Sequence, residues 1–264
     1  MARVDIADAD DPRVAAYTSV RERDLSRGGQ FIGEGENVLR VLLGPRSNFR
    51  VTSLFLAEPR ARTLDALVGH LEIPVYVAPQ PVMDQVVGFP IHRGVLAVAE
   101  RGPARSPATL LDDLGPGPRQ ILVLSQLANH DNVGGIFRNA AAFGVDAVLL
   151  DETTCDPLYR KSIRVSVGGA LVVPFAQAPI AEILHALGAR GFTVYGLSPR
   201  GAADLRTLRA PPRYALMLGA EGPGLPDELL AQTEPVRIDM APGFDSLNVS
   251  VTSGIALFAL GQGR

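Results

Sequence analysis

Short apolar runs typical of buried strands alternate with helical stripes through the second half of the chain. The apolar runs predict strands over 120–127, 147–150, 170–175, 193–197, 214–218 and 236–240. Apolar residues at helical spacing predict helices over 132–143, 180–189, 226–232 and 248–260. Strands that are apolar throughout and separated by helices form a parallel sheet covered on both faces. The sequence therefore predicts an α/β fold, in which ligands bind beyond the carboxyl ends of the strands.

The first part of the chain mixes the same two kinds of element. Helices are predicted over 12–24, 35–43, 63–71 and 82–87, and strands over 51–57, 74–78 and 94–99. This alternation predicts a small layered α/β domain. Seven of the seventeen residues in 102–118 are Gly or Pro, which is typical of a linker. The predicted organisation is a first domain over 1–101, a linker over 102–118 and a second domain over 119–264.

Composition excludes several classes of protein. The single cysteine, Cys155, permits no internal disulfide and fits a reducing cytosol, so we expect a cytoplasmic protein. The first residues show no apolar run of a secretory signal, and 246–263 is too polar for a membrane span. The four histidines lie far apart, so no metal site is expected. Net charge is −3, yet residues 13–62 carry nine Arg against five acidic residues, a local excess of +4.

Three segments that follow predicted strands are rich in glycine and polar residues, namely 129–139, 218–225 and 239–250. They match none of the common ligand motifs. The chain has no GxGxxG after a strand, no GxxxxGK[ST] and no GxSxG, so a dinucleotide fold, a P-loop and the usual hydrolase elbow are not indicated. What remains is a set of loops whose backbones can approach a ligand closely.

Each segment taken alone also has an ordinary structural explanation. Asn129 or Asp131 can be the N-cap of the helix that follows, and Asp245, Ser246 or Asn248 can cap the last helix. The second segment can be a plain turn from strand to helix. Three such segments in one parallel sheet favour a shared binding site instead.

The three segments also spell ordered motifs. The first motif is carried by Asn129, Asn132, Gly134, Ile136, Arg138, Ala140 and Gly144. The second is carried by Gly219, Glu221, Gly222, Gly224 and Leu225, and the third by Ile238, Met240, Leu247, Asn248, Val249 and Ser250. In this order and spacing, residues 120–264 resemble the SpoU (TrmH-type) branch of the SPOUT superfamily of RNA methyltransferases. An intervening stretch, Asp156-Pro157 followed by Arg164, Ser166 and Gly168, is also similar to that family.

The amino-terminal part is similar to the substrate-binding domain that often precedes this catalytic domain, which itself resembles small RNA-binding ribosomal proteins. The matching pieces are 31–38 and 92–97. Asn37 stands where a basic residue is common, and Arg93 stands where glutamine is common.

The resemblance implies a deep trefoil knot in the second domain and S-adenosylmethionine as methyl donor, whose sulfonium needs no metal. It implies that backbone groups of the second and third segments hold the cofactor, at Leu218, Gly219, Ile238, Met240 and Leu247. It also implies a homodimer that packs through the last helix, where the apolar side formed by Val251, Ile255, Phe258 and Ala259 serves as core or interface.

The resemblance further implies catalytic roles for Arg138, Asn132, Glu221, Ser246 and Asn248. Guanidinium rarely deprotonates, so we expect Arg138 to bind the target phosphate and stabilise the developing alkoxide rather than act as a general base. Asn132 would orient the ribose or Arg138. Glu221 would contact RNA or stabilise its loop, and Ser246 and Asn248 would bind the target nucleotide or cap the helix. The cluster of Tyr159, Arg160, Lys161 and Arg164 is a candidate for phosphate contacts.

The resemblance thus implies an enzyme that methylates a ribose 2′-hydroxyl in structured RNA, and family analogy favours ribosomal RNA over transfer RNA as its substrate. Two alternatives stay open. One is a non-catalytic RNA-binding or assembly protein that retains the fold, and the other is an antibiotic-resistance methyltransferase acting on ribosomal RNA.

Overall fold

The computed structural model describes residues 2–18, 29–244 and 246–261, which form two compact units. The first unit comprises Met1–Pro103 with Leu158–Val172, and the second comprises Ala104–Pro157 with Val173–Arg264. The predicted boundary near residue 101 therefore lies close to the first division. The segment 158–172, which the prediction assigns to the second domain, packs with the first unit instead.

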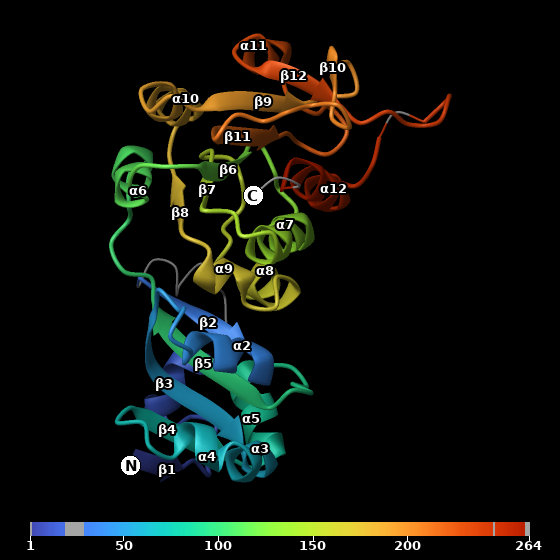
Figure 1. Ribbon diagram of the computed structural model, residues 1–264. Coiled ribbons are helices and arrows are strands. Elements are labelled where there is room, and N and C mark those ends of the chain that lie inside the picture. The colour runs from blue at the N-terminus through green and yellow to red at the C-terminus, as the bar shows by residue number, and fades with distance from the viewer. Residues whose placement is uncertain (1, 19–28, 245, 262–264) are drawn as a thin grey trace. The chain divides into compact units, whose positions relative to one another are not determined.

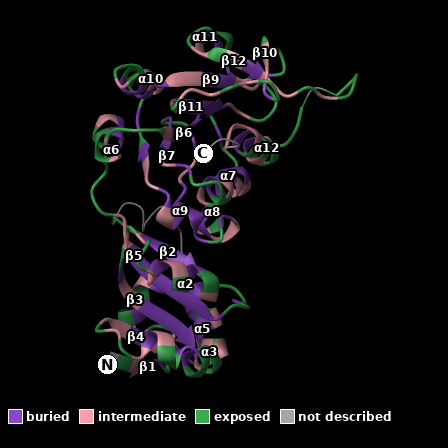
Figure 2. Cartoon of the chain, viewed as in Figure 1, coloured by how far each residue is buried: buried purple, intermediate pink, exposed green. Residues whose placement is uncertain are grey.

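The second unit is built on a parallel sheet of seven strands in the order β10-β12-β9-β11-β6-β7-β8. The strands are β6 (Arg119–Leu124), β7 (Ala147–Leu150), β8 (Phe175–Gln177), β9 (Thr193–Leu197), β10 (Ala203–Asp204), β11 (Arg213–Leu218) and β12 (Glu234–Arg237). Their central members are buried along almost their whole length (Figure 2). The parallel α/β sheet predicted from the apolar runs is confirmed.

Helices cover both faces of this sheet (Figure 1). They are α6 (Pro107–Asp113), α7 (His130–Ala142), α10 (Ile180–Gly188), α11 (Asp227–Leu230) and α12 (Val249–Gly261). On one face α6 and α10 pack against a core that includes Val123, Leu149 and Met217. Neighbouring residues along each strand point to the other face, where α7 and α12 pack against each other.

Two predicted elements of this region are corrected. The run 170–175 is not a strand, because Gly169–Val172 form the short helix α9 and β8 begins only at Phe175. A short apolar run has no periodicity that separates a buried strand from a buried helical turn. The predicted strand 236–240 lies earlier, since β12 ends at Arg237 and the chain then leaves the ladder.

The stretch 102–118 contains α6 and is more than a linker. The Ser106 hydroxyl caps this helix by accepting a hydrogen bond from the Thr109 N–H at 3.1 Å, and Pro107 occupies its first turn. Leu110 and Leu111 are both 1% exposed in the core of the second unit. Part of the Gly and Pro content therefore marks the ends of a packed helix.

The first unit has a mixed sheet of five strands in the order β1-β4-β3-β5-β2. Its strands are β1 (Ala2–Asp5), β2 (Gln30–Glu34), β3 (Arg50–Ala57), β4 (Pro74–Ala78) and β5 (Val95–Glu100). Its helices are the 3₁₀ helix η1 (Pro12–Tyr17), α2 (Glu36–Leu42), α3 (Glu58–Thr63), α4 (Asp65–Val68) and α5 (Gln80–Val87), together with α8 (Arg160–Val165) and α9. Of the predicted helix 12–24, residues 19–24 lie outside the described residues, and the predicted helix 63–71 is two short helices ending at Val68.

The segment 158–172 is joined to the first unit through a buried carboxylate. Glu34, at the end of β2, accepts a hydrogen bond from Arg164 at 3.2 Å and lies 3.7 Å from the Arg160 guanidinium. The Asn48 N–H also donates to the Leu171 carbonyl at 3.2 Å. Two members of the predicted phosphate-binding cluster are therefore engaged with Glu34 within this unit. In the described part of the chain, no helix is both long enough and apolar enough to cross a membrane.

Leu110→Ala tests whether 102–118 is an integral part of the second unit. We expect a loss of about 2–5 kcal/mol in the free energy of unfolding, because the change removes a buried side chain and leaves a cavity. Denaturant unfolding measures it, with the exposed Arg209→Ala in the same unit as a control expected to stay within about 0.5 kcal/mol. Equal stability of the two variants would show that α6 is dispensable.

Candidate active site

A cavity of about 890 Å³ opens at the carboxyl ends of the adjacent strands β12, β9 and β11. The segments that line it are 197–200, 218–225, 238, 240, 246–249 and 252. The sequence predicted a site at this edge of the sheet, and the cavity lies there. It brings together the five predicted cofactor residues, which are Leu218, Gly219, Ile238, Met240 and Leu247.

The loop after β11 is folded so tightly that its first residue must be glycine. A Cβ on Gly219 would lie 2.5 Å from the carbonyl carbon of Gly224 and from the nitrogen of Leu225. The Gly224 N–H donates to the Ala220 carbonyl at 3.0 Å, which closes the loop on itself. Gly219, Gly222 and Gly224 of this loop all line the cavity, so main-chain groups form part of its wall, as the resemblance implies for cofactor binding.

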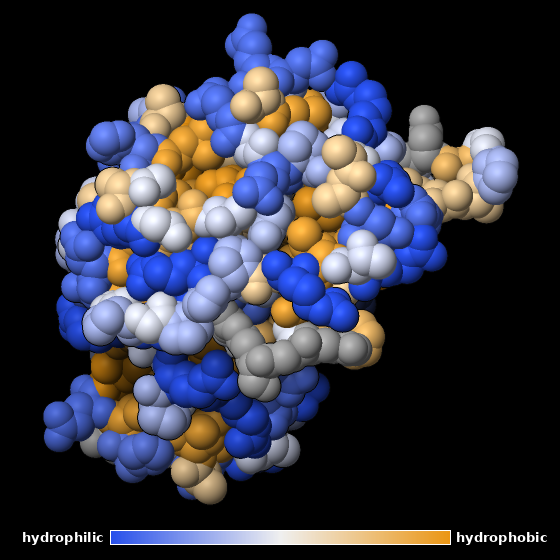
Figure 3. Space-filling view, turned by 45° about the horizontal axis from the view of Figure 1, so that its top comes forward, coloured by the Kyte–Doolittle hydropathy of each residue, from blue (hydrophilic) through white to orange (hydrophobic). Residues whose placement is uncertain are grey.

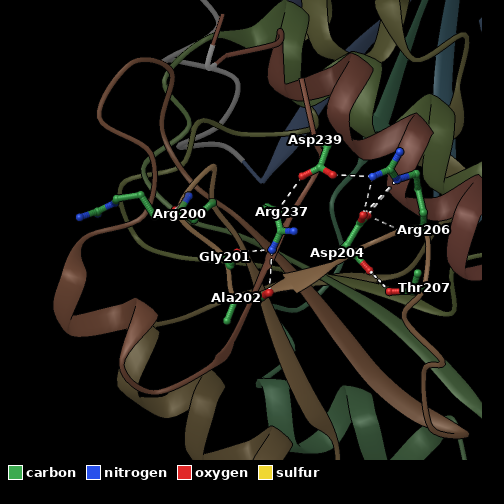
Figure 4. Close-up of polar contacts among 9 residues, drawn as sticks. Arg200, Gly201, Ala202, Asp204, Arg206, Thr207, Arg237 and Asp239 are labelled. Carbon is green, nitrogen blue, oxygen red and sulfur yellow. Dashed lines mark hydrogen bonds and ion pairs between the residues drawn. The ribbon is translucent and has the colours of Figure 1, made fainter. Parts of the chain in front are cut away.

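The segment after β12 is held at the sheet edge by a network of ion pairs, drawn in Figure 4. The carboxylate of Asp239 accepts a hydrogen bond from Arg237 at 2.7 Å and a second one from Arg206. Arg206 also binds Asp204 at 2.6 Å, and its hydrogen bonds hold the pKa of Asp204 at about 2. Arg237 donates further to the Ala202 carbonyl at 2.7 Å. These contacts fix the backbone immediately before Met240.

A relay of side-chain hydrogen bonds connects the three predicted motifs. The Asn248 Nδ2 donates to the Asn132 Oδ1 at 2.8 Å, and the Asn132 Nδ2 donates to a carboxylate oxygen of Glu221. The Asn248 Oδ1 accepts the backbone N–H of Ser250 at 2.9 Å. An ionised carboxylate can only accept hydrogen bonds, so Glu221 fixes the orientation of both amides. Asn132, which is 6% exposed, is the buried centre of this relay.

The ordinary capping explanation also holds for two of these residues. Asn129 caps α7 by accepting the Asp131 N–H at 2.8 Å, and Asn248 caps α12. Asn248 therefore serves both the helix and the relay. Ser246 is exposed at the cavity wall and is not the residue that caps α12, whereas Asp245 lies outside the described residues.

Arg138 lies apart from the cavity wall. It is exposed on α7 and makes no hydrogen bond or ion pair within the described part of the chain. Of the five predicted catalytic residues, the structure brings together Asn132, Glu221, Ser246 and Asn248 around the cavity or its relay. Arg138 is left with a free guanidinium that is available to an incoming ligand.

The sequence analysis did not single out Asn139, which ties α7 to α12. Its Nδ2 donates to the Ser250 carbonyl at 2.7 Å and to the Ser253 hydroxyl at 2.9 Å. Asn139 follows Asn132 by seven residues, a spacing that puts both on one face of a helix and was visible in the sequence. The cavity residues Ser198 and Arg200 were also missed, although they follow a predicted strand in the same way as the other segments.

Cys155 lies near this region but is unsuited to nucleophilic catalysis. Burial, followed by the negative charges of Asp156 and Glu221, raises the pKa of its thiol to about 11. A nucleophilic cysteine requires the opposite, a thiolate stabilised by positive charge. In the described residues, no group of three His, Cys, Asp or Glu side chains is placed to hold a metal ion.

The relay predicts energetic coupling between Asn132 and Asn248. In a double-mutant cycle with Asn132→Ala and Asn248→Ala, we expect a coupling energy of about 0.5–3 kcal/mol, because each change removes the shared hydrogen bond. Denaturant unfolding of the parent, both single variants and the double variant measures it. The pair Asn132→Ala and Thr109→Ala is the control and should be additive. Additivity of the first pair as well would contradict the relay.

Comparison with known proteins identifies the family. The SpoU rRNA Methylase family matches residues 119–258. An uncharacterised tRNA/rRNA methyltransferase of Mycobacterium tuberculosis strain H37Rv is 38% identical over 265 residues, which cover 96% of this chain and 90% of the relative. The 23S rRNA (guanosine-2′-O-)-methyltransferase RlmB of Pseudomonas syringae is 33% identical over 217 residues, which cover 79% and 86%.

Solved structures share the fold. The AdoMet-bound rRNA methyltransferase of Sinorhizobium meliloti matches with a TM-score of 0.82 at 23% identity, covering 97% of each chain. The SpoU methyltransferase AviRb of Streptomyces viridochromogenes matches with a TM-score of 0.79 at 22% identity, covering 96% of this chain and 98% of its own. The match to the family model over residues 119–258 and the 38% identity to the Mycobacterium tuberculosis relative show that the chain belongs to the SpoU rRNA methylase family.

Proposed function

We propose that this protein is an S-adenosylmethionine-dependent RNA methyltransferase that modifies a ribose 2′-hydroxyl of ribosomal RNA. The observation that carries the proposal is the single cavity formed by the second and third family motifs and joined to the first motif by the relay. The relative from Mycobacterium tuberculosis is named a tRNA/rRNA methyltransferase, and the relative from Pseudomonas syringae is named a 23S rRNA (guanosine-2′-O-)-methyltransferase.

The cavity residues fit the cofactor. A volume of about 890 Å³ lies within the usual range for small-molecule sites, and the lining glycines Gly219, Gly222 and Gly224 have no side chains to cover their main-chain groups. Leu218, Gly219 and Ile238 would hold the adenine and ribose, with Met240 and Leu247 beside them. S-adenosylmethionine supplies a methyl group already activated on a sulfonium. The knot that the resemblance implies would enclose this cavity.

We assign the binding of the target nucleotide to exposed residues at or near the cavity. The free guanidinium of Arg138 would bind the phosphate of the target nucleotide and stabilise charge that develops on the ribose oxygen. Glu221 keeps Asn132 oriented, and Ser246 would contact the target nucleotide. The first unit would supply additional RNA affinity, as its resemblance to RNA-binding ribosomal proteins implies. Because ribosomal RNA is the proposed substrate, we also propose a cytoplasmic location.

We also infer that two copies pair through α12. Val251, Ile255 and Phe258 are exposed on this helix, and the Phe258 ring lies 6.4 Å from that of Phe143, which is also exposed. A contiguous apolar surface of this kind is typical of a protein interface.

The decisive test is a map of 2′-O-methyl groups in total RNA from cells with and without the gene. We expect one or a few ribosomal RNA sites to lose their methyl group when the gene is deleted. Loss confined to transfer RNA would correct the substrate. An unchanged map, with purified protein that binds RNA but transfers no methyl group, would favour the non-catalytic assembly protein. If strains that carry the gene resist a drug and strains without it do not, and the lost methyl group lies in ribosomal RNA, the resistance enzyme would be favoured.

Arg138→Ala should lower the single-turnover rate of methyl transfer about 10²–10³-fold while leaving cofactor affinity unchanged, because Arg138 lies outside the cavity wall. Arg138→Lys should rescue poorly, since an ammonium lacks the planar fork. The exposed Arg209→Ala in the same unit is the matched control and should keep the parent rate. Parent-like transfer by Arg138→Ala would remove this residue from the mechanism, and loss of cofactor binding would make its role structural.

Ile255→Asp tests the interface. Light scattering at micromolar concentration should show a dimer for the parent and a monomer for the variant, because the change places a charge in an apolar contact. Ala181→Asp, an equally charged change on the exposed side of α10, should leave the dimer intact. A monomeric parent would refute the pairing.

A further inference from the structure

Phe244 has a wholly apolar side chain, yet this side chain lies exposed on the surface. It is 73% exposed, more than any other large apolar side chain among the described residues. The next highest value belongs to Phe258 on α12, at 59%. The turn that carries Phe244 and the position of that turn indicate a function for this exposure.

A tight turn fixes the place of Phe244. Its N–H donates to the Ala241 carbonyl at 3.1 Å, and the two residues between are Pro242 and Gly243. Gly243 has φ of 85°, the left-handed value that the third residue of a type II turn requires, and proline at the second position presets its own φ. Little backbone freedom therefore remains to be lost when Phe244 binds a partner.

Both ends of the segment that carries this turn are anchored. On the β12 side, Asp239 is bound by Arg206 and Arg237 (Figure 4). On the α12 side, Asn248 caps the helix and donates to Asn132. The segment between these anchors projects from the second unit, and the space-filling view shows hydrophobic surface on the projection (Figures 1 and 3).

The turn stands at the rim of the cavity assigned to the methyl donor. Met240, just before the turn, and Ser246, just after it, both line the cavity. A nucleotide whose ribose reaches the donor must pass this rim with its base. Aromatic rings bind bases by stacking, which needs no particular base because every base has a flat π-face.

We propose that Phe244 stacks on the base of the nucleotide whose ribose is methylated, an inference that rests on the proposed function. The turn holds the ring where the base arrives, so base and ribose are positioned together. The nucleotide that receives the methyl group must approach this same cavity rim, so RNA rather than a second copy is the partner that the position of Phe244 favours.

The test compares two substitutions that separate stacking from general apolar contact. Phe244→Leu keeps an apolar side chain and loses the ring, whereas Phe244→Tyr keeps the ring. The substrate is ribosomal RNA extracted from cells that lack the gene. For Phe244→Leu we expect kcat/KM for this RNA to fall about 5- to 100-fold, with a matching rise in the Kd from filter binding. Phe244→Tyr should restore most of both, and calorimetry should give the parent affinity for S-adenosylmethionine in both variants.

Three other outcomes would overturn the proposal. Parent-like kcat/KM and RNA affinity in Phe244→Leu would show that the ring has no role in RNA binding. Conversion of the dimer to a monomer by Phe244→Leu, seen by light scattering, would assign the ring to contact with a second copy. Failure of Phe244→Tyr to rescue would exclude stacking. If the parent transfers no methyl group the proposed function fails, and the filter-binding comparison of the two variants still decides the role of Phe244.

Discussion

A relay of hydrogen bonds from the Ser250 N–H through Asn248 and Asn132 to Glu221 holds the site together. Its members come from three segments separated by about 90 and 30 residues in the chain, and each segment follows a strand of the parallel sheet. The carboxylate can only accept, so it sets both amides in one orientation. The relay supplies a side-chain hydrogen bond between the loop after β11 and α7, and it joins Asn139 in tying the start of α12 to α7.

The site offers two kinds of chemistry. In the cavity lining, glycines such as Gly219 suit a ligand recognised by main-chain groups. Outside the cavity lining, the exposed Arg138 and Phe244 suit a ligand with phosphates and bases, such as RNA. The ion pairs of Asp239 fix the backbone just before Met240, which lines the cavity, and just before the projecting turn that carries Phe244. Donor and acceptor can thus be bound by neighbouring stretches of one segment.

The sequence predicted those features that depend on local pattern. The apolar runs at 147–150 and 193–197 coincide with β7 and β9, and the motif residues Leu218 and Met240 do line one cavity. Features that depend on tertiary context escaped prediction. The run 170–175 contains a helical turn, α6 lies within a stretch rich in Gly and Pro, and β1, β2 and β10 were not predicted. The packing of 158–172 with the first unit depends on Glu34, which is far away in sequence. No local pattern pairs Glu34 with Arg164.

The most direct test of the account is calorimetric titration of the full chain and of Asn132→Ala with S-adenosylmethionine. The account predicts saturable binding of one cofactor per chain to the parent and several-fold weaker binding to the folded variant, because the relay holds the Glu221 loop in place. No heat with S-adenosylmethionine or its demethylated product, alongside tight binding of a nucleoside triphosphate, would contradict the assignment of the cavity.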